Sequence, residues 1–107
     1  LGWMHQSGRG VPKDDAEAVR WYRLAAEQDH PGGQYNLGWM YQNGRGVPQD
    51  EGSAYMWFSI AVSRASGGFR RSAIKARDIA GEKLTPNQLA YAEYRAREWD
   101  APNPRER

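Results

Sequence analysis

The chain has 107 residues, enough for one domain whose core is small for its surface. Apolar residues make up 39% of it, and five tryptophans and six tyrosines concentrate the burial into a few large side chains. The net charge of +2 argues against polyanion binding by bulk charge, and the absence of cysteine excludes disulfides and thiolate metal sites. No run approaches the ~18 apolar residues that span a bilayer, so we expect no membrane insertion.

The sequence repeats itself with a period of 36 residues. LGWMHQSGRGVPKD, at residues 1–14, returns as LGWMYQNGRGVPQD at residues 37–50. Of the 26 aligned positions from Leu1 to Ala26, 14 are identical. Self-similarity at this spacing is typical of stacked repeats, in which no unit buries its apolar face alone. The chain is therefore predicted to be a fragment of a solenoid.

The first unit is predicted to hold the end of one helix and the whole of the next. Residues 1–7 have a helical pattern, and GRGVP then ends the helix, with Gly8 and Gly10 at positive φ. Asp14 is placed to cap a helix over residues 15–28. One apolar stripe, expected to be buried, consists of Ala18, Trp21, Tyr22 and Ala25.

The second unit repeats this logic with a more complete first helix, over about residues 32–43. GRGVP returns at residues 44–48, Asp50 takes the capping role, and His30 is expected at an exposed junction before the unit. The predicted core side of the first helix is Gly33, Leu37, Met40 and Tyr41. The predicted stripe of the second helix is Ala54, Trp57, Phe58, Ala61 and Ala65.

The third unit departs from the pattern, because a helix runs on from Gly67 without a GRGVP turn. Thr85 and Gln88 then form a capping box for a last helix. Its apolar stripe of Leu89, Ala92, Ala96 and Trp99 lies opposite Glu93, Arg95, Arg97 and Glu98. A charged terminal unit is what the end of a solenoid requires. The tail, residues 100–107, is predicted to be disordered.

These motifs resemble the Sel-one-like repeat (SLR) family, which is related to the tetratricopeptide repeats. The residues that match its pattern in the second copy are Leu37, Gly38, Met40, Tyr41, Gly44, Gly46, Val47, Asp50, Ala54, Trp57 and Ala61. The closing helix is similar to that of many bacterial members. In one departure, Gly33 stands where the family usually has alanine, which should loosen that helix by ~1 kcal/mol.

The resemblance implies an all-α fold, a right-handed αα-superhelix of antiparallel helix pairs. We expect about two and a half repeats plus a capping helix in one domain, residues 1–99, with units 1–31, 32–66 and 67–99. Such arrays serve as non-catalytic scaffolds that bind a peptide or partner protein on the concave face. The candidate binding residues on that face are Trp3, Gln6, Tyr35, Trp39, Gln42 and Asn43. The alternative is that each tryptophan packs against a neighbouring unit as structure.

Catalytic and cofactor functions find little support. GRGVP lacks the preceding strand and the Lys-Ser/Thr of a phosphate loop, so we interpret it as a turn with Arg9 and Arg45 solvated at its tip. His5 and His30 have no acid at ligand spacing, so no metal site or cofactor is expected. Some cysteine-rich relatives are associated with β-lactam binding or hydrolysis, but this chain has no cysteine and no nucleophile–base pair. Asp14 and Asp15 are explained by helix capping.

Two further partner hypotheses rest on charge and on exposed apolar residues. From residue 64 onward the chain has ten basic and six acidic residues, and five of the basic ones fall between Arg64 and Arg77. This stretch, residues 64–77, suggests nucleic acid or an acidic partner, but only Phe69 is there to stack on bases, so we favour a solvated helix face. Leu1, Trp3 and Met4 suggest self-association through the N-terminal end.

The sequence does not select a compartment. Leu1 falls in the middle of a repeat, so we expect upstream sequence, and any signal peptide would lie there. A chain without cysteine suits reducing and oxidising surroundings alike. Both a cytoplasmic and a periplasmic or secreted location therefore stay open.

Overall fold

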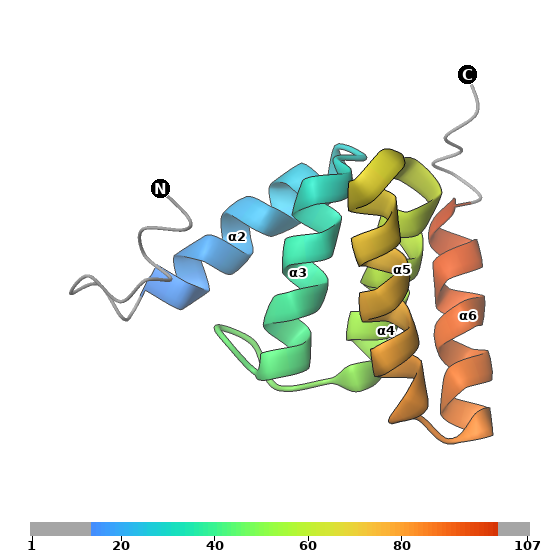
Figure 1. Ribbon diagram of the computed structural model, residues 1–107. Helices are drawn as coiled ribbons and strands as arrows, with labels where there is room; N and C mark the ends of the chain where they lie inside the picture. Colours follow the sequence, from blue (N-terminus) through green and yellow to red (C-terminus); the bar gives the residue numbers. More distant parts are fainter. Residues whose placement is uncertain (1–13, 101–107) are drawn as a thin grey trace.

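The computed structural model describes residues 14–100 (Figure 1). In this range the chain forms helices and no strand: α2 (Asp14–Glu27), α3 (Pro31–Asn43), α4 (Glu51–Arg64), α5 (Gly67–Glu82) and α6 (Pro86–Asp100). The predicted all-α fold class is thereby confirmed, while the hand of the superhelix stays a prediction. Expectations for residues 1–13, among them Trp3, His5, Gln6 and Arg9, lie outside the described residues, as do those for residues 101–107.

Helix α4 occupies the centre of the array. It packs against α3, α5 and α6, while α2 packs against α3. In Figure 1, α3 to α6 run nearly upright beside one another and α2 lies obliquely on the far side of α3. Because α4 has neighbours on several sides, it contains the most buried side chains, with Phe58, Ile60 and Ala61 at most 1% exposed.

The helix starts follow the local signals in the sequence. The carboxylate of Asp50, the N-cap of α4, accepts a hydrogen bond from the Ser53 N–H at 3.2 Å. Before α6, the Thr85 N–H donates to Gln88 Oε1 at 2.9 Å and the Gln88 N–H donates to Thr85 Oγ1 at 3.2 Å. The predicted cap at Asp50 and the predicted capping box are confirmed, because each satisfies backbone donors at a helix start.

The turn at residues 44–48 returns the chain from α3 to α4 and lies against α2. Gly44 and Gly46 have φ values of 63° and 78°, a left-handed conformation that favours glycine. A Cβ atom on Gly46 would lie 2.5 Å from the carbonyl oxygen of Asp15. Two constraints therefore require glycine at position 46: its left-handed backbone conformation and its close contact with the first turn of α2.

The contact between α2 and α3 depends on Gly33, which was predicted only to loosen its helix. A Cβ atom on Gly33 would lie 2.6 Å from the Cβ of Ala25 and 3.0 Å from the backbone nitrogen of Ala26. Gly33 lowers the helix propensity of α3, as expected, but it also lets the two helices approach closely. The expectation of a merely looser helix was therefore incomplete.

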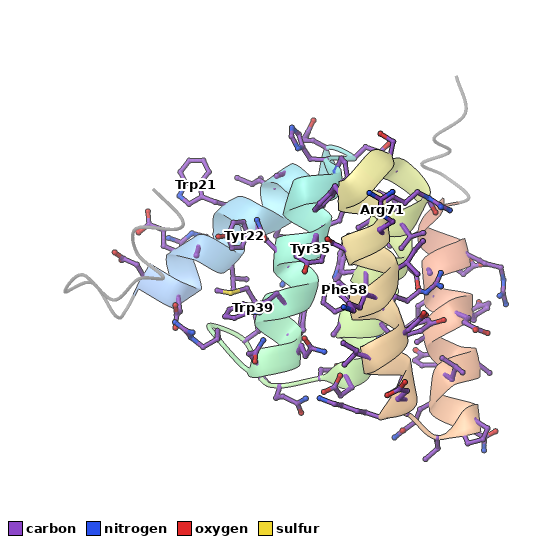
Figure 2. The ribbon with its side chains drawn as sticks, in the orientation of Figure 1. Trp21, Tyr22, Tyr35, Trp39, Phe58 and Arg71 are labelled. Carbon is purple, nitrogen blue, oxygen red and sulfur yellow. The ribbon has the colours of Figure 1, made fainter. Side chains whose placement is uncertain are left out.

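The predicted burial of Trp21 is wrong. Its side chain is 64% exposed, and it points away from α3 in Figure 2. Helix α2 instead buries Ala18, Val19 and Ala26. Trp57 holds the equivalent position one period later and is only 5% exposed, because Trp99 of α6 packs on it edge to face, with ring centroids 5.8 Å apart. Equivalent positions in the two repeat copies thus differ in the residues that pack on them.

Candidate functional site

A groove separates α3, the first helix of the predicted second unit, from α5, the first helix of the predicted third unit. Its volume is about 250 Å³. It is lined by residues from both helices: Tyr35 and Gln42 from α3, and Ser72, Lys75, Ala76 and Ile79 from α5. The α3 pair is spaced i, i+7, and on α5 the spacing of Ser72, Ala76 and Ile79 is i, i+4, i+7, so each set occupies one face of its helix. The two helix faces therefore form the two sides of one hollow.

Tyr35 is held in place by two other aromatic rings. Its ring centroid lies 5.4 Å from that of Phe58 and 5.4 Å from that of Phe69, with interplanar angles of 50° and 65°. These are favourable tilted and edge-to-face arrangements. Figure 2 shows Tyr35 on the α5 side of α3, near Phe58. Phe58 is fully buried and Phe69 is 38% exposed, so the rings connect the core to the surface of the groove.

Ala76 and Ile79 provide the apolar surface on the α5 side of the groove, beside the polar Ser72 and Lys75. Ile79 is 44% exposed, and Ala76 packs on the cluster that contains Phe58 and Ala80. Pockets for cofactors and drug-sized ligands typically measure roughly 300–1,000 Å³. At about 250 Å³ the groove suits one or two side chains of a peptide better than a cofactor.

The predicted binding residues do not all come together at this groove. Tyr35 and Gln42 line it, whereas Trp39 lies on the α2 side of α3 in Figure 2. Trp39 is half-buried against two core clusters, and the Asn43 amide donates to its carbonyl at 2.9 Å. Trp3 and Gln6 lie outside the described residues. Trp39 thus contributes packing, which supports the structural alternative for this residue.

The residues on the α5 side of the groove were not among the predicted binding residues. The i, i+4, i+7 spacing of Ser72, Ala76 and Ile79 was available as a signal. The basic residues in 64–77 instead favoured a solvated helix face. Helix α5 has one charged face and one weakly apolar face. Only the position of α3 shows that the weakly apolar face lines the groove.

The prediction that Arg45 is a solvated turn residue is incomplete. Its guanidinium donates to both carboxylate oxygens of Asp15, at 2.8 and 3.1 Å, and lies 5.7 Å from the ring centroid of Trp39. The hydrogen bond and charge of Asp15 raise the pKa of Arg45. Asp15 therefore joins the turn to α2, which helix capping alone did not predict.

Some basic residues of the stretch 64–77 form contacts within the fold. The side chain of Arg64 is 4% exposed, forms an ion pair with Asp29 and lies 5.2 Å from the ring centroid of Trp99. Arg70 donates to the carbonyl of Val62 at 3.2 Å, and Arg77 binds Asp78 at 3.1 Å. Arg70, Arg71 and Lys75 are exposed. Because the Arg64 side chain is buried and Arg77 is paired with Asp78, the exposed basic surface is smaller than the one that the nucleic-acid hypothesis assumed.

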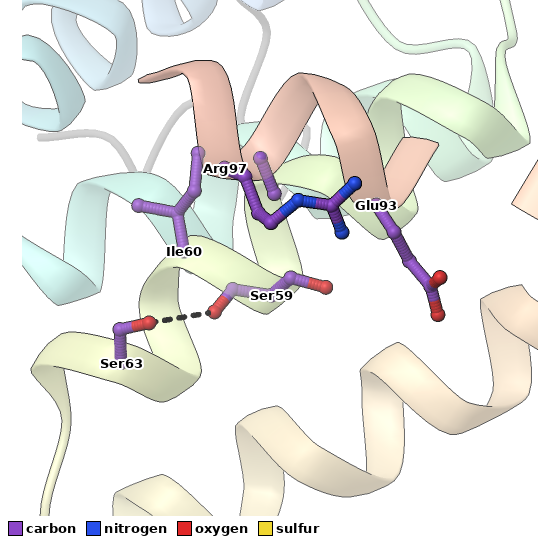
Figure 3. A pocket seen from close by; sticks show the side chains of 6 residues that line it. Ser59, Ile60, Ser63, Glu93 and Arg97 are labelled. Atoms are coloured by element: carbon purple, nitrogen blue, oxygen red, sulfur yellow. Dashed lines mark hydrogen bonds between the residues drawn. The ribbon is translucent and has the colours of Figure 1, made fainter. Parts of the chain in front are cut away.

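A second hollow, of about 240 Å³, lies between α4 and α6 (Figure 3). Its lining residues are Ser59, Ile60, Ser63, Glu93, Ala96 and Arg97. The Ser63 hydroxyl donates to the Ser59 carbonyl at 3.4 Å, as Figure 3 shows, so it is engaged with the helix backbone. Glu93 accepts from the Tyr55 hydroxyl at 3.4 Å, and burial followed by the charge of Glu93 raises the pKa of that phenol. The described lining therefore offers no serine–histidine pair for nucleophilic catalysis.

The described residues carry neither a metal cluster nor a membrane span. Within 14–100, no group of three or more His, Cys, Asp or Glu side chains is placed to hold a metal ion. In the same range, none of the helices combines the length and apolar character needed to cross a bilayer.

Comparison with known proteins identifies the repeat. No curated protein and no solved structure matches the chain. The family model described as Sel1 repeat matches twice, at residues 1–30 and 31–66, which together cover more than half of the sequence. Sel1 repeats are generally protein-interaction modules and are typically non-catalytic. With two adjacent matches and an all-α array of helix pairs, the chain belongs to the Sel1 repeat family.

Proposed function

We propose that this chain is a non-catalytic interaction module that holds a peptide segment of a partner protein in the groove between α3 and α5. The observation that carries the proposal is an open, mainly apolar hollow formed by the first helices of two consecutive predicted units. In arrays of this kind the first helices are expected to line the concave face. A groove on that face is therefore a suitable binding surface for an extended peptide.

The groove is suited to binding because its principal aromatic residue is already ordered. Tyr35 is packed between Phe58 and Phe69, so little side-chain entropy remains to be lost when a ligand docks. Tyrosine is also among the residues that most often dominate binding energy at interfaces. Ile79, nearly half exposed, supplies apolar area that a partner side chain would remove from water.

The test is to select peptides from a displayed library of random nine-residue sequences and to measure their affinities by fluorescence anisotropy. Ile79→Asp places a charge in the groove and should weaken binding by at least tenfold. Because Ile79 is 44% exposed, the helical circular dichroism of this variant should stay unchanged. Tyr91→Ala is the matched control, since Tyr91 is 63% exposed on α6 and does not line the groove. Equal binding by both variants would place the site elsewhere.

A further inference from the structure

Resting on the proposed function, we infer that the groove selects an acidic segment, one that places an Asp or Glu carboxylate beside an apolar side chain. The apolar side chain would fill the hollow between Tyr35 and Ile79. The carboxylate would lie at the edge of α5, against Lys75 and Arg71. The inference adds the chemistry of the partner, which the presence of a groove does not itself define.

The charges around the groove have one sign where the ligand would lie. Helix α3 contains no charged residue along its whole length. Among the residues that line the groove, all within the described chain, Lys75 is the one that carries a charge. Arg71 precedes Lys75 by one helical turn, so both lie on the same side of α5, and both are exposed. Figure 2 shows Arg71 near the end of α5 that faces the start of α3.

The neighbouring charges on α5 do not cancel this field. Its other basic residues, Arg70 and Arg77, are engaged with the Val62 carbonyl and with Asp78. Its two acids are Asp78, which Arg77 binds at 3.1 Å, and Glu82, in the last turn. A carboxylate at the Lys75 end of the groove therefore meets positive charge, whereas a basic segment meets repulsion there.

The apolar and charged parts of the groove are adjacent, and this determines which types of residue the ligand must place side by side. Lys75 and Ala76 are consecutive, and Ile79 follows Lys75 by four residues, so the ammonium group lies beside the apolar surface. Gln42, on the opposite side, offers an amide that can donate to and accept from a peptide backbone. A ligand that matches all three features carries an acid next to an aliphatic or aromatic residue.

The experiment uses the same nine-residue library and asks which peptides depend on Ile79. Those whose binding is lost with Ile79→Asn, a neutral substitution that does not itself repel acids, should be at least twofold enriched in Asp and Glu over the unselected library. Synthesis of the selected peptides with Asn and Gln in place of the acids should weaken binding about two- to fivefold, the size of effect that an exposed charge pair supplies. Binding of the acidic form should also weaken as salt is raised from 50 to 300 mM, because exposed charges are screened.

Charge reversal on the protein supplies the matched control. Lys75→Glu should weaken the acidic peptides at least tenfold, whereas Arg97→Glu, which changes the net charge equally but lies on α6, should leave binding within twofold. Groove-dependent peptides that are neutral or basic would overturn the acidic inference and leave the proposed function standing. Equal loss with both charge reversals would reduce the effect to bulk attraction and overturn it too. A library with no Ile79-dependent peptide would overturn both proposals.

Discussion

Two adjacent glycines near the start of α3 should respond oppositely to alanine. In the described part of the chain, a Cβ on Gly32 would meet nothing within 4 Å, whereas one on Gly33 would lie 2.6 Å from Ala25 Cβ. Gly32→Ala should raise the free energy of unfolding by roughly 0.5–1 kcal/mol through helix propensity and a less flexible unfolded chain. Gly33→Ala should lower it by roughly 1–3 kcal/mol, because overpacking forces α2 and α3 apart.

Urea unfolding followed by circular dichroism measures both changes, and each variant serves as the control for the other. Stabilisation by both substitutions would show that α2 yields easily at Ala25. The family preference for alanine at the position of Gly33 would then reflect helix propensity alone.

At the residue scale, the sequence predicts the role of a side chain when the groups that it contacts are close in the sequence. Asp50, Thr85 and Gln88 act on backbone groups within three residues, so their roles were predictable. The difference between Trp21 and Trp57 was not, because it depends on Trp99, which lies 42 residues beyond Trp57 in the sequence. Identical residues at identical repeat positions carry no information about what packs on them.

At the scale of elements, consecutive units are joined by an acid–base pair. Asp15, in the first turn of α2, is bound by Arg45 from the following turn. One period later the same place holds Glu51, in the first turn of α4, and Lys83 lies 3.6 Å from its carboxylate. The third unit lacks the glycine turn but keeps a base at the end of its first helix. We interpret the pair as a recurring link between units, independent of the turn itself.

The link between Asp15 and Arg45 should be measurable but modest. Their side chains are 24% and 39% exposed, so water screens the pair, and exposed pairs typically contribute ~0.2–1 kcal/mol. In a double-mutant cycle with Asp15→Asn and Arg45→Gln, we expect a coupling energy of about 0.5–1 kcal/mol at low salt. The bidentate geometry favours the upper part of that range.

Salt provides the control for this cycle. The coupling should shrink in 1 M NaCl, where the Debye length is only ~3 Å. A coupling energy that is zero at low salt, or that does not change with salt, would mean that the contact of Gly46 with α2 positions the turn without help from the charges.

The groove shows what the sequence predicts at the scale of elements and what it leaves out. Periodicity was sufficient to place the helices of the described residues, and two of the predicted binding residues, Tyr35 and Gln42, line the groove. Trp39 is about 40° of helix rotation from Tyr35 and faces α2, so its binding role stays a prediction. The opposite side of the groove, on α5, depended on a tertiary contact between units.

At the scale of the whole molecule, one buried arginine connects the first described helix pair to the last helix. Arg64, at the end of α4, forms an ion pair with Asp29, in the α2–α3 junction, and its guanidinium lies over Trp99 of α6. Asp29 has a φ of 69° and also accepts from the Gln34 amide at 3.4 Å. The junction and α6 are therefore both held by the same side chain, although they are distant in sequence.

Arg64→Met should therefore destabilise two separate regions at once. Removing one partner of a buried ion pair costs roughly 3–5 kcal/mol. Because Asp29 is 39% exposed, the carboxylate left behind is partly solvated, and we expect about 1–3 kcal/mol here. In hydrogen exchange, the amides of α6 and of the α2–α3 junction should both exchange faster in this variant. Arg71→Met, an exposed arginine on α5, should change stability by less than ~0.5 kcal/mol.

The distribution of the exchange effect separates a long-range connection from local packing. Methionine keeps much of the apolar stem of Arg64, so the end of α4 should retain its contacts while Asp29 and Trp99 lose the guanidinium. Adding Asp29→Asn removes the unpaired charge yet keeps a residue that tolerates positive φ, so it should restore protection in the junction and not in α6. Faster exchange confined to the end of α4 would mean that each unit is stable by itself. The array would then be held together by its neighbouring contacts alone, as in a simple one-dimensional solenoid.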